Sequence, residues 1–335
     1  MMTKTYIYNK VVGAMMALLP VCLLATVPAT AEAKKQKQLV ILHTNDTHST
    51  ILPLNPNIDN KDLAGRGGFL RRVNMIKEQR AEHPDLLLFD SGDFSQGSGY
   101  YTLFKGEVEI GLMNQMGYDA ATIGNHEFDF GMDNMAKIFR QANFPIVCSN
   151  YGVEGTVLEG LVKPYITLKR SGVKIGVFAL APPMKGLVFY GNCKGIEFLD
   201  PAETAQKYID ILRRQEKCDL VICISHLGWE VSEYPDEKFI IATEGCDLVL
   251  GGHTHTYMPA LEYAPDKNGK MIPCVIRSVR KSVVISSSFP LMVLTLSERS
   301  FSQAIRQESR SGTPPRPSAV MQSKSGCVMS ASSVR

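Results

Sequence analysis

Five short segments of the chain each place His, Asp or Asn directly after an apolar run. The residues are Asp46 and His48 in HTNDTHS, Asp93 in DSGDF, Asn125, His126 and Asp129 in GNHEFD, His226 in ISHLG, and His253 and His255 in GGHTHT. Imidazole nitrogens mixed with carboxylate and amide oxygens suit divalent ions such as Zn²⁺ or Mn²⁺. The set holds too many donors for one ion and enough for two, so we expect a dinuclear centre of the kind that promotes phosphoryl transfer.

Each segment alone has an ordinary structural explanation. Asp-x-His at a strand end is commonly a turn or a cap, and Gly-Asp is common in turns. GGHTHT is more specific, because alternate positions of an extended segment place His253 and His255 on one face. Six of the seven histidines lie in these five segments, which is not expected of randomly placed histidines. The combination therefore favours a metal site. His43 lies within an apolar run and is expected to pack in the core.

Strand-like and helix-like segments alternate between these motifs. QLVILHTND and LLLFDSGD read as buried strands with polar ends, and Phe69, Val73 and Ile76 recur at helical spacing. Asp200 followed by Pro201 predicts the start of a further helix. The alternation predicts a layered α/β domain whose functional residues lie at the carboxyl ends of its strands.

The first residues have the pattern of a secretory signal peptide. Lys4 and Lys10 precede the apolar run VVGAMMALLPVCLLATVPA, and the AEA at Ala31–Ala33 fits a cleavage site. We therefore expect residues 1–33 to be removed on export to the periplasm or the medium, and residues 34–38 to be a short lead-in. No stable membrane span is expected after cleavage, and the alternative is an uncleaved anchor.

Cysteine usage and charge narrow the class of protein further. None of the eight cysteines forms a CxxC pair, and several lie in apolar segments, so buried thiols are expected, with one or two disulfides as the alternative in an exported protein. The net charge of +3 arises from a basic carboxyl end, where nine Lys and Arg face two Glu after residue 275. The rest is mildly acidic, which argues against binding of a nucleic-acid duplex.

Composition changes abruptly near the carboxyl end. From Ile276 onward the chain has sixteen Ser and no Asp, Asn, His, Tyr or Trp. SSSFPLMVLTLSERS could form one strand, but the rest of residues 277–335 lacks periodicity and is expected to be disordered or read in a shifted frame. Residues 39–276 are expected to form the catalytic domain.

The order of the motifs, D-x-H, G-D, G-N-H-E, H and G-H-x-H, resembles that of the calcineurin-like metallophosphoesterases over roughly Leu39 to Pro259. HTNDTH, GNHEFDFG and GGHTH resemble the secreted 5′-nucleotidase branch of that family. The resemblance implies an α/β/β/α sandwich, incomplete here at its carboxyl-terminal strands. It also implies a hydrolase in nucleotide catabolism, which releases phosphate from nucleoside monophosphates by attack of a hydroxide that bridges two metal ions.

The resemblance further implies a role for each motif residue. The implied ligands are Asp46, His48 and His255 for the first ion, Asp93 as the bridge, and Asn125, His226 and His253 for the second ion. His126 is implied to be the catalytic imidazole, oriented by Asp129. Glu127 is expected to bond to supporting or backbone groups, and Asn150, at the end of a strand, is a candidate for substrate contact.

Other functions remain open at this stage. Full-length family members carry a second domain that grips the nucleoside, so a separate chain would supply that grip here or it would be absent. Alternatives are a 2′,3′-cyclic-nucleotide phosphodiesterase, a broad phosphomonoesterase, or a metal-binding scaffold without turnover. The presence of His126 and Asp129 argues against the scaffold, because metal binding alone would not need them.

Overall fold

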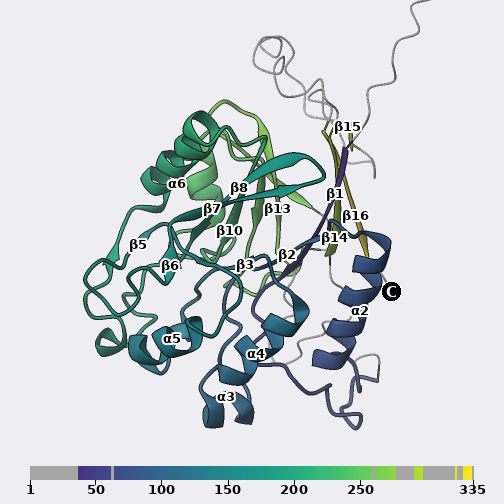
Figure 1. Cartoon of the computed structure of the whole chain (residues 1–335), viewed down its shortest axis with the longest axis vertical. Helices are drawn as coiled ribbons and strands as arrows, with labels where there is room; N and C mark the ends of the chain where they lie inside the picture. The colour runs from purple at the N-terminus through teal and green to yellow at the C-terminus, as the bar shows by residue number, and fades with distance from the viewer. Residues whose placement is uncertain are drawn as a thin grey trace, which may run out of the picture. The chain divides into compact units, whose positions relative to one another are not determined.

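The structure, a computed structural model, describes residues 37–61, 64–258, 261–276, 290–296, 321–322 and 327–333. Within the unit that begins at Gln36, two mixed sheets stack face to face, and helices cover the outer face of each sheet (Figure 1). This arrangement confirms the predicted layered α/β/β/α sandwich.

The first sheet has eight strands in the order β15-β16-β14-β1-β2-β3-β4-β6. Five of them run parallel: β1 (Lys37–Thr44), β2 (Leu87–Asp90), β3 (Ala120–Ala121), β4 (Ile146–Val147) and β6 (Val162–Lys163). The other three extend the sheet in antiparallel fashion beyond β1: β14 (Pro290–Leu296), β16 (Cys327–Ser333) and β15 (Met321–Gln322).

The second sheet has six strands in the order β12-β13-β11-β10-β8-β7. Its four central strands are parallel: β8 (Val173–Leu180), β10 (Leu220–Ser225), β11 (Leu248–Leu250) and β13 (Met271–Val275). Its two edge strands pair antiparallel: β7 (Tyr165–Arg170) with β8, and β12 (Glu262–Pro265) with β13. A separate short pair joins β5 (Tyr151–Gly152) and β9 (Glu197–Phe198).

Helices cover the outer face of each sheet. Figure 1 shows one group on the lower side of the view: α2 (Phe69–Glu82), α3 (Gly99–Phe104), α4 (Glu107–Met116) and α5 (Gly131–Phe139). The second sheet is covered by α6 (Pro201–Asp210), its π-helical extension η3 (Ile211–Gln215) and α7 (Asp236–Ala242). Two short 3₁₀ turns complete the described helices: η1 (His126–Phe128) and η2 (Tyr190–Asn192).

The alternation of side chains along β1 shows why its apolar run is continuous. Leu39 and Ile41 point into the core between the two sheets, whereas Val40 and Leu42 pack against the helices of the first layer. A strand that is buried on both faces needs apolar residues at every position. The polar residues therefore begin only where β1 ends, at the edge of the sheet.

Several local predictions are confirmed. Asp200 caps α6, since its Oδ1 accepts hydrogen bonds from the backbone N–H groups of Ala202 at 2.8 Å and Glu203 at 2.9 Å, and Pro201 occupies the first turn. The six described cysteines outside the tail are buried free thiols: Cys148, Cys193, Cys218, Cys223, Cys246 and Cys274.

Few of the residues at the two ends of the chain are described by the structure, so few of the expectations for these ends can be compared with it. β14 lies within SSSFPLMVLTLSERS and pairs with β1 from Leu296 opposite Lys37 to Leu291 opposite Leu42. β15 and β16 fall within the stretch that was expected to be disordered or frame-shifted. The signal peptide at residues 1–33 and most of residues 277–335 lie outside the described residues. Across the described part of the chain, every helix is too short or too polar to span a bilayer.

Candidate dinuclear metal centre

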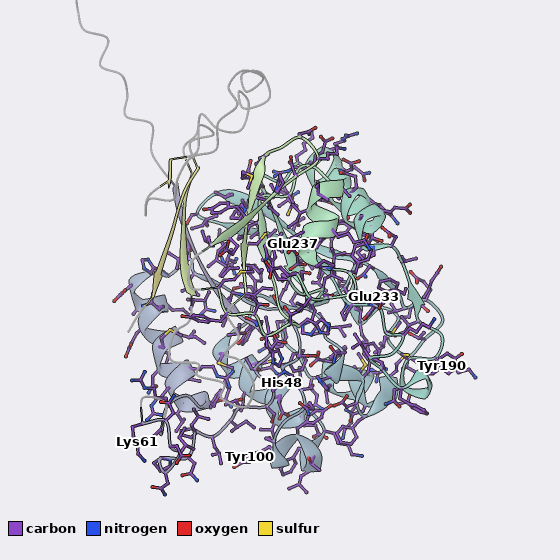
Figure 2. The ribbon with its side chains drawn as sticks, turned by 180° about the vertical axis from the view of Figure 1, so that it is seen from behind. His48, Lys61, Tyr100, Tyr190, Glu233 and Glu237 are labelled. Atoms are coloured by element: carbon purple, nitrogen blue, oxygen red, sulfur yellow. The ribbon has the colours of Figure 1, made fainter. Side chains whose placement is uncertain are left out.

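The candidate residues come together at one edge of the two stacked sheets. Asp46, Asp93 and Asn125 follow β1, β2 and β3 of the first sheet, while His226 and His253 follow β10 and β11 of the second. All five strands are parallel within their sheets, so their carboxyl ends meet at the same edge. Figure 2 shows His48 near the middle of the molecule, within this region.

Three groups of side chains place their metal-ligating atoms within 4.8 Å of one another. They are Asp46, His48 and His255; His48, Asp93 and His126; and Asp93, His226 and His253. His48 and Asp93 each belong to two of the groups. Six of the seven predicted ligands, all except Asn125, therefore form one continuous cluster together with His126.

Asp46 connects the two ends of this cluster. Its Oδ1 lies 3.4 Å from Nε2 of His255 and 3.9 Å from Nε2 of His226. The backbone N–H of His253 donates to both of its oxygens, at 3.0 and 3.1 Å, and the Asn45 amide donates to Oδ2 at 2.6 Å. These bonds fix the carboxylate in the direction of the imidazoles.

Asp93 occupies the middle of the cluster. Its Oδ2 lies 3.1 Å from Nε2 of His226, and its Oδ1 accepts a hydrogen bond of 2.9 Å from the backbone N–H of His126. Nδ1 of His226 faces the carbonyl oxygen of Ser91 at 2.5 Å, which leaves Nε2 directed at the carboxylates. Such a bond to the far nitrogen is the usual way in which a protein orients a histidine ligand.

The backbone at these positions adopts a conformation that L-residues rarely take. The φ angles are +48° at Asp46, +42° at His48, +54° at Asp93, +71° at His253 and +52° at His255. Each such residue costs about 1–3 kcal/mol and persists where the surrounding structure imposes it. Five of the eleven described non-Gly residues with positive φ are candidate ligands, so this conformation is concentrated at the site.

Gly124 makes room for the cluster. A Cβ atom at this position would lie 2.2 Å from Oδ1 of Asp93 and 2.7 Å from Nε2 of His226. No side chain larger than hydrogen fits between these groups, which explains the glycine in front of Asn125.

Electrostatics favour a cation at the centre. Burial raises the pKa of Asp46 and Asp93, but the neighbouring imidazoles outweigh it and hold both pKa values below the ordinary range. Burial lowers the pKa of His226, but Asp93 and Asp46 outweigh it and raise the pKa to about 10. Burial and the charge on His226 lower the pKa of His253 to about 4. The positive charge of protonated His226 therefore balances part of the negative charge of two buried carboxylates. A divalent cation held by the same residues would balance this negative charge instead of the proton on His226.

Two polar atoms of the candidate residues have no hydrogen-bond partner within the described part of the chain. They are Oδ1 of Asn125 and Nδ1 of His48, and both are buried. Unpaired buried polar atoms are rare because they lose their bonds to water. The unpaired amide oxygen and imidazole nitrogen are the atoms with which Asn and His bind metals, so the residues fit an ion.

His126 belongs to one of the three groups, and its ring is half-exposed. Its Nδ1 lies 3.1 Å from Oδ2 of Asp129, and its ring centroid lies 5.4 Å from that of His48. The Tyr101 hydroxyl donates to the carbonyl oxygen of His126 at 3.1 Å and fixes the turn. Asp129 therefore holds the ring of His126 at Nδ1.

Glu127 has the supporting position that the sequence indicated. Its buried carboxylate accepts the backbone N–H groups of Asp93 at 3.0 Å, Ser95 at 3.1 Å and Gly124 at 2.6 Å. Burial and the charge of Asp93 raise its pKa to about 7. Glu127 therefore joins the loops after β2 and β3 and takes no direct part in the cluster.

Two other expectations have structural outcomes. Asn150 is fully buried, and its side chain accepts from the N–H and donates to the carbonyl of Ala181, both at 2.8 Å, so its contacts give no support to substrate binding. His43 is buried and bonds to the Ser91 hydroxyl at 2.8 Å, which confirms a packing residue. The sequence did not predict that Tyr101 fixes the turn at His126 or that the Ser91 carbonyl orients His226. A backbone carbonyl and a single Tyr belong to no recognisable sequence motif.

Comparison with known proteins gives a consistent result. Residues 39–257 match the family described as Calcineurin-like phosphoesterase. The chain is 32% identical to a snake venom 5′-nucleotidase of Gloydius brevicauda over 66% of this chain and 37% of that protein. It is 30% identical to a 2′,3′-cyclic-nucleotide 2′-phosphodiesterase/3′-nucleotidase of Haemophilus influenzae over 76% of this chain and 42% of that protein.

A solved structure extends the likeness to the fold. The crystal structure of a 5′-nucleotidase precursor from Thermus thermophilus superposes with a TM-score of 0.68 at 26% identity, over 78% of this chain and 52% of that one. The chain spans about two fifths of the length of the two curated relatives above. The likeness therefore concerns the part of those proteins that this chain matches.

Proposed function

Because the chain belongs to the calcineurin-like phosphoesterase family, we propose that it is a dinuclear-metal phosphohydrolase that releases phosphate from nucleoside monophosphates. One observation supports the proposal: candidate ligands that follow β1, β2, β10 and β11 form a single cluster with His126, whose ring is held by Asp129. A site that only bound metal would have no use for an oriented, half-exposed imidazole outside the ligand set.

The proposed ligands are divided between two ions. Asp46, His48 and His255 would hold the first, Asn125, His226 and His253 would hold the second, and Asp93 would contribute to both. The mixed nitrogen and oxygen donors suit Zn²⁺ or Mn²⁺. Two such ions would activate a water nucleophile and neutralise charge on the phosphoryl oxygens.

His126 is the proposed catalytic residue of the chain itself. Its imidazole, held at Nδ1 by Asp129, is placed to donate a proton or hydrogen bond from Nε2 to a phosphoryl oxygen or the leaving oxygen. Glu127 maintains the Asp93 and Gly124 loops on which this geometry depends.

Two broader activities stay within the same chemistry. The Haemophilus influenzae relative is named as a 2′,3′-cyclic-nucleotide 2′-phosphodiesterase/3′-nucleotidase, which makes cyclic nucleotides the second candidate substrate. A broad phosphomonoesterase is the third. AMP, 3′-AMP, 2′,3′-cyclic AMP and a simple alkyl phosphate, assayed side by side, separate the three.

The deciding experiment combines metal analysis with hydrolysis. The chain without residues 1–33, loaded with Mn²⁺ or Zn²⁺, is expected to bind two ions and release phosphate from AMP, and a chelator is expected to abolish the reaction. Stoichiometric metal binding without hydrolysis of any of the four esters would favour a scaffold. Hydrolysis that persists in chelator would overturn the dinuclear mechanism.

The proposal includes export. The basic start, the apolar run and the AEA before residue 34 support cleavage of residues 1–33. Sequencing the amino terminus of protein recovered from a periplasmic or extracellular fraction tests this directly. The comparisons lend no support to a separate chain that supplies a nucleoside-binding domain, so the proposal does not include one.

The carboxyl end carries its own proposal. The abrupt change of composition after Ile276 supports translation in a shifted frame for residues 277–335. Sequencing the coding DNA tests this proposal. If no other reading frame of the downstream DNA encodes a family-like continuation, the proposal is wrong.

A further inference from the structure

An apolar pocket of about 470 Å³ opens beside His48. It lies between the segment that follows β1 and helix α3, and its apolar walls are formed by Ile51, Leu52, Tyr100, Leu103 and Phe104. Figure 2 shows Tyr100 at the lower edge of the view, below His48. The volume falls within the range of about 300–1,000 Å³ that is typical of small-molecule sites.

The apolar side chains that form the walls of this pocket are more exposed to solvent than is usual for large apolar residues. The exposed fraction is 61% for Leu52, 75% for Leu103, 48% for Phe104 and 38% for Tyr100. Tyr100, Leu103 and Phe104 are spaced i, i+3 and i+4, so they lie on one face of α3. Exposed apolar residues that gather on one face mark a binding surface more often than those that occur singly.

Helix α3 is fixed in place relative to the candidate catalytic residues. The Ser98 hydroxyl caps it by accepting from the backbone N–H groups of Tyr100 and Tyr101, and the Tyr101 hydroxyl donates to the His126 carbonyl. Gly97 allows the preceding loop to pass against His48, since a Cβ there would lie 2.7 Å from the His48 carbonyl oxygen. The apolar face therefore stands at a set distance from the reaction centre.

The pocket and the metal cluster share one residue. His48 lines the pocket and also belongs to two of the ligand groups, and its ring lies 5.4 Å from that of His126. A phosphate placed at the cluster would thus have its ester group at the mouth of the pocket. A second cavity of about 400 Å³ beside Asp129 is lined by polar groups that include Gln96 and Thr102, so it does not offer the same apolar surface.

We propose that this pocket is the leaving-group subsite and takes a flat apolar ring, such as a nucleobase or an aryl group; the inference rests on the proposed phosphohydrolase function. Two of the polar side chains that line it are already committed, because Ser49 bonds to Ser98 and donates to Glu109. Recognition then comes from stacking and burial, which every base allows. The chain accepts adenine, guanine, pyrimidine and simple aryl esters in this pocket with little preference.

The test uses two leucines that differ only in position. Leu103 in the pocket is 75% exposed and Leu70 on α2, outside it, is 74% exposed, so Leu103→Ser and Leu70→Ser have matched costs for folding. Tyr100→Ala removes the aromatic wall. For Leu103→Ser and Tyr100→Ala we expect kcat/KM to fall about 5- to 20-fold with AMP and p-nitrophenyl phosphate. With glycerol 3-phosphate, which has no ring, we expect a change below about twofold, and Leu70→Ser should match the wild type throughout.

Each outcome bears on the pocket or on the reaction separately. Equal losses for ringed and ringless esters, or no loss at all, would overturn the subsite while leaving the phosphohydrolase intact. If the wild type hydrolyses none of the esters, the proposed function fails, and equilibrium dialysis with adenosine then decides the pocket. Adenosine binding that Tyr100→Ala weakens and Leu70→Ser preserves supports the pocket, and absence of binding to the wild type overturns it.

Discussion

Asp93 and His226 meet across the two sheets, with Oδ2 of the carboxylate 3.1 Å from Nε2 of the imidazole. Asp93 follows β2 of the first sheet and His226 follows β10 of the second, so this contact joins the two layers at the site. The other oxygen of Asp93 accepts the backbone N–H of His126. A single carboxylate therefore links a proposed ligand of one ion to the turn that carries the proposed catalytic residue.

Asp93→Asn tests the shared ligand. The amide has the shape of the carboxylate but lacks its charge, so the variant is expected to fold and to lose at least one bound ion. We expect kcat with AMP to fall by a factor of about 10³ or more, because a ligand of both ions is lost. Mass spectrometry of bound metal and the rise in melting temperature on adding Mn²⁺ give readouts independent of turnover. Two tightly bound ions and normal turnover would contradict the assignment.

His126→Ala separates catalysis from metal binding. Because His126 lies outside the proposed ligand set, the variant is expected to keep both ions while kcat falls about 10²- to 10⁴-fold, the usual contribution of a proton donor. Asp129→Asn, which removes only the partner 3.1 Å from Nδ1, is expected to lower activity about 10- to 100-fold. His83→Ala, at the end of α2, is the control. Loss of metal in His126→Ala would instead make this residue a ligand.

Gly124→Ala tests the packing of the cluster by a single methyl group. The added Cβ would lie 2.2 Å from Oδ1 of Asp93, so the carboxylate must move and we expect weaker metal binding and little turnover. Gly111 in α4 offers the matched control, since a Cβ there meets nothing within 4 Å. Gly111→Ala is expected to stabilise the fold by up to about 1 kcal/mol and to leave activity unchanged. Comparable activity in the two variants would contradict the role of Gly124.

The sequence was informative wherever local chemistry determined the structure. The continuous apolar run of β1, the Asp200–Pro201 helix start and the polar residues after β1, β2, β3, β10 and β11 all follow from periodicity and capping, and the structure has them. The convergence of five strand ends was inferred from the α/β pattern, because parallel strands bring their carboxyl ends to one edge.

The parts that were missed depend on tertiary contacts. Ser98 caps α3, whose six residues have too few turns to produce a periodic signal in the sequence. The antiparallel edge strand β12 has four residues, of which only Ala264 is buried, so it carries no clear alternation. Asn150 seemed suited to substrate contact because it ends a strand, but only the structure reveals that the Ala181 backbone occupies its amide.

Asp236 at the start of α7 is a buried carboxyl group that supports the site from behind. Its Oδ1 accepts from the Ser225 hydroxyl, next to His226, and its Oδ2 has no hydrogen-bond partner among the described residues. Burial raises its pKa from 3.8 to about 8. The folded state therefore retains a proton that the unfolded chain releases near pH 4.

This difference predicts how stability depends on pH. Below pH 4 the Asp236 carboxyl is protonated in both the folded and the unfolded state, so it does not affect the free energy of unfolding. From pH 4 to about 8 only the folded state keeps the proton, so the free energy of unfolding falls as the pH rises. Above pH 8 the carboxyl is ionised in both states, and the loss of stability stays constant. The slope from one proton is at most about 1.4 kcal/mol per pH unit. Asp236→Asn keeps the acceptor for Ser225 without the titration, so its stability relative to wild type should rise by about 1–3 kcal/mol from pH 5 to pH 8. Urea unfolding of both proteins in chelator measures the difference in their free energies of unfolding, with Asp59→Asn at an exposed position as the control. A difference that does not change with pH would show that Asp236 does not carry this proton.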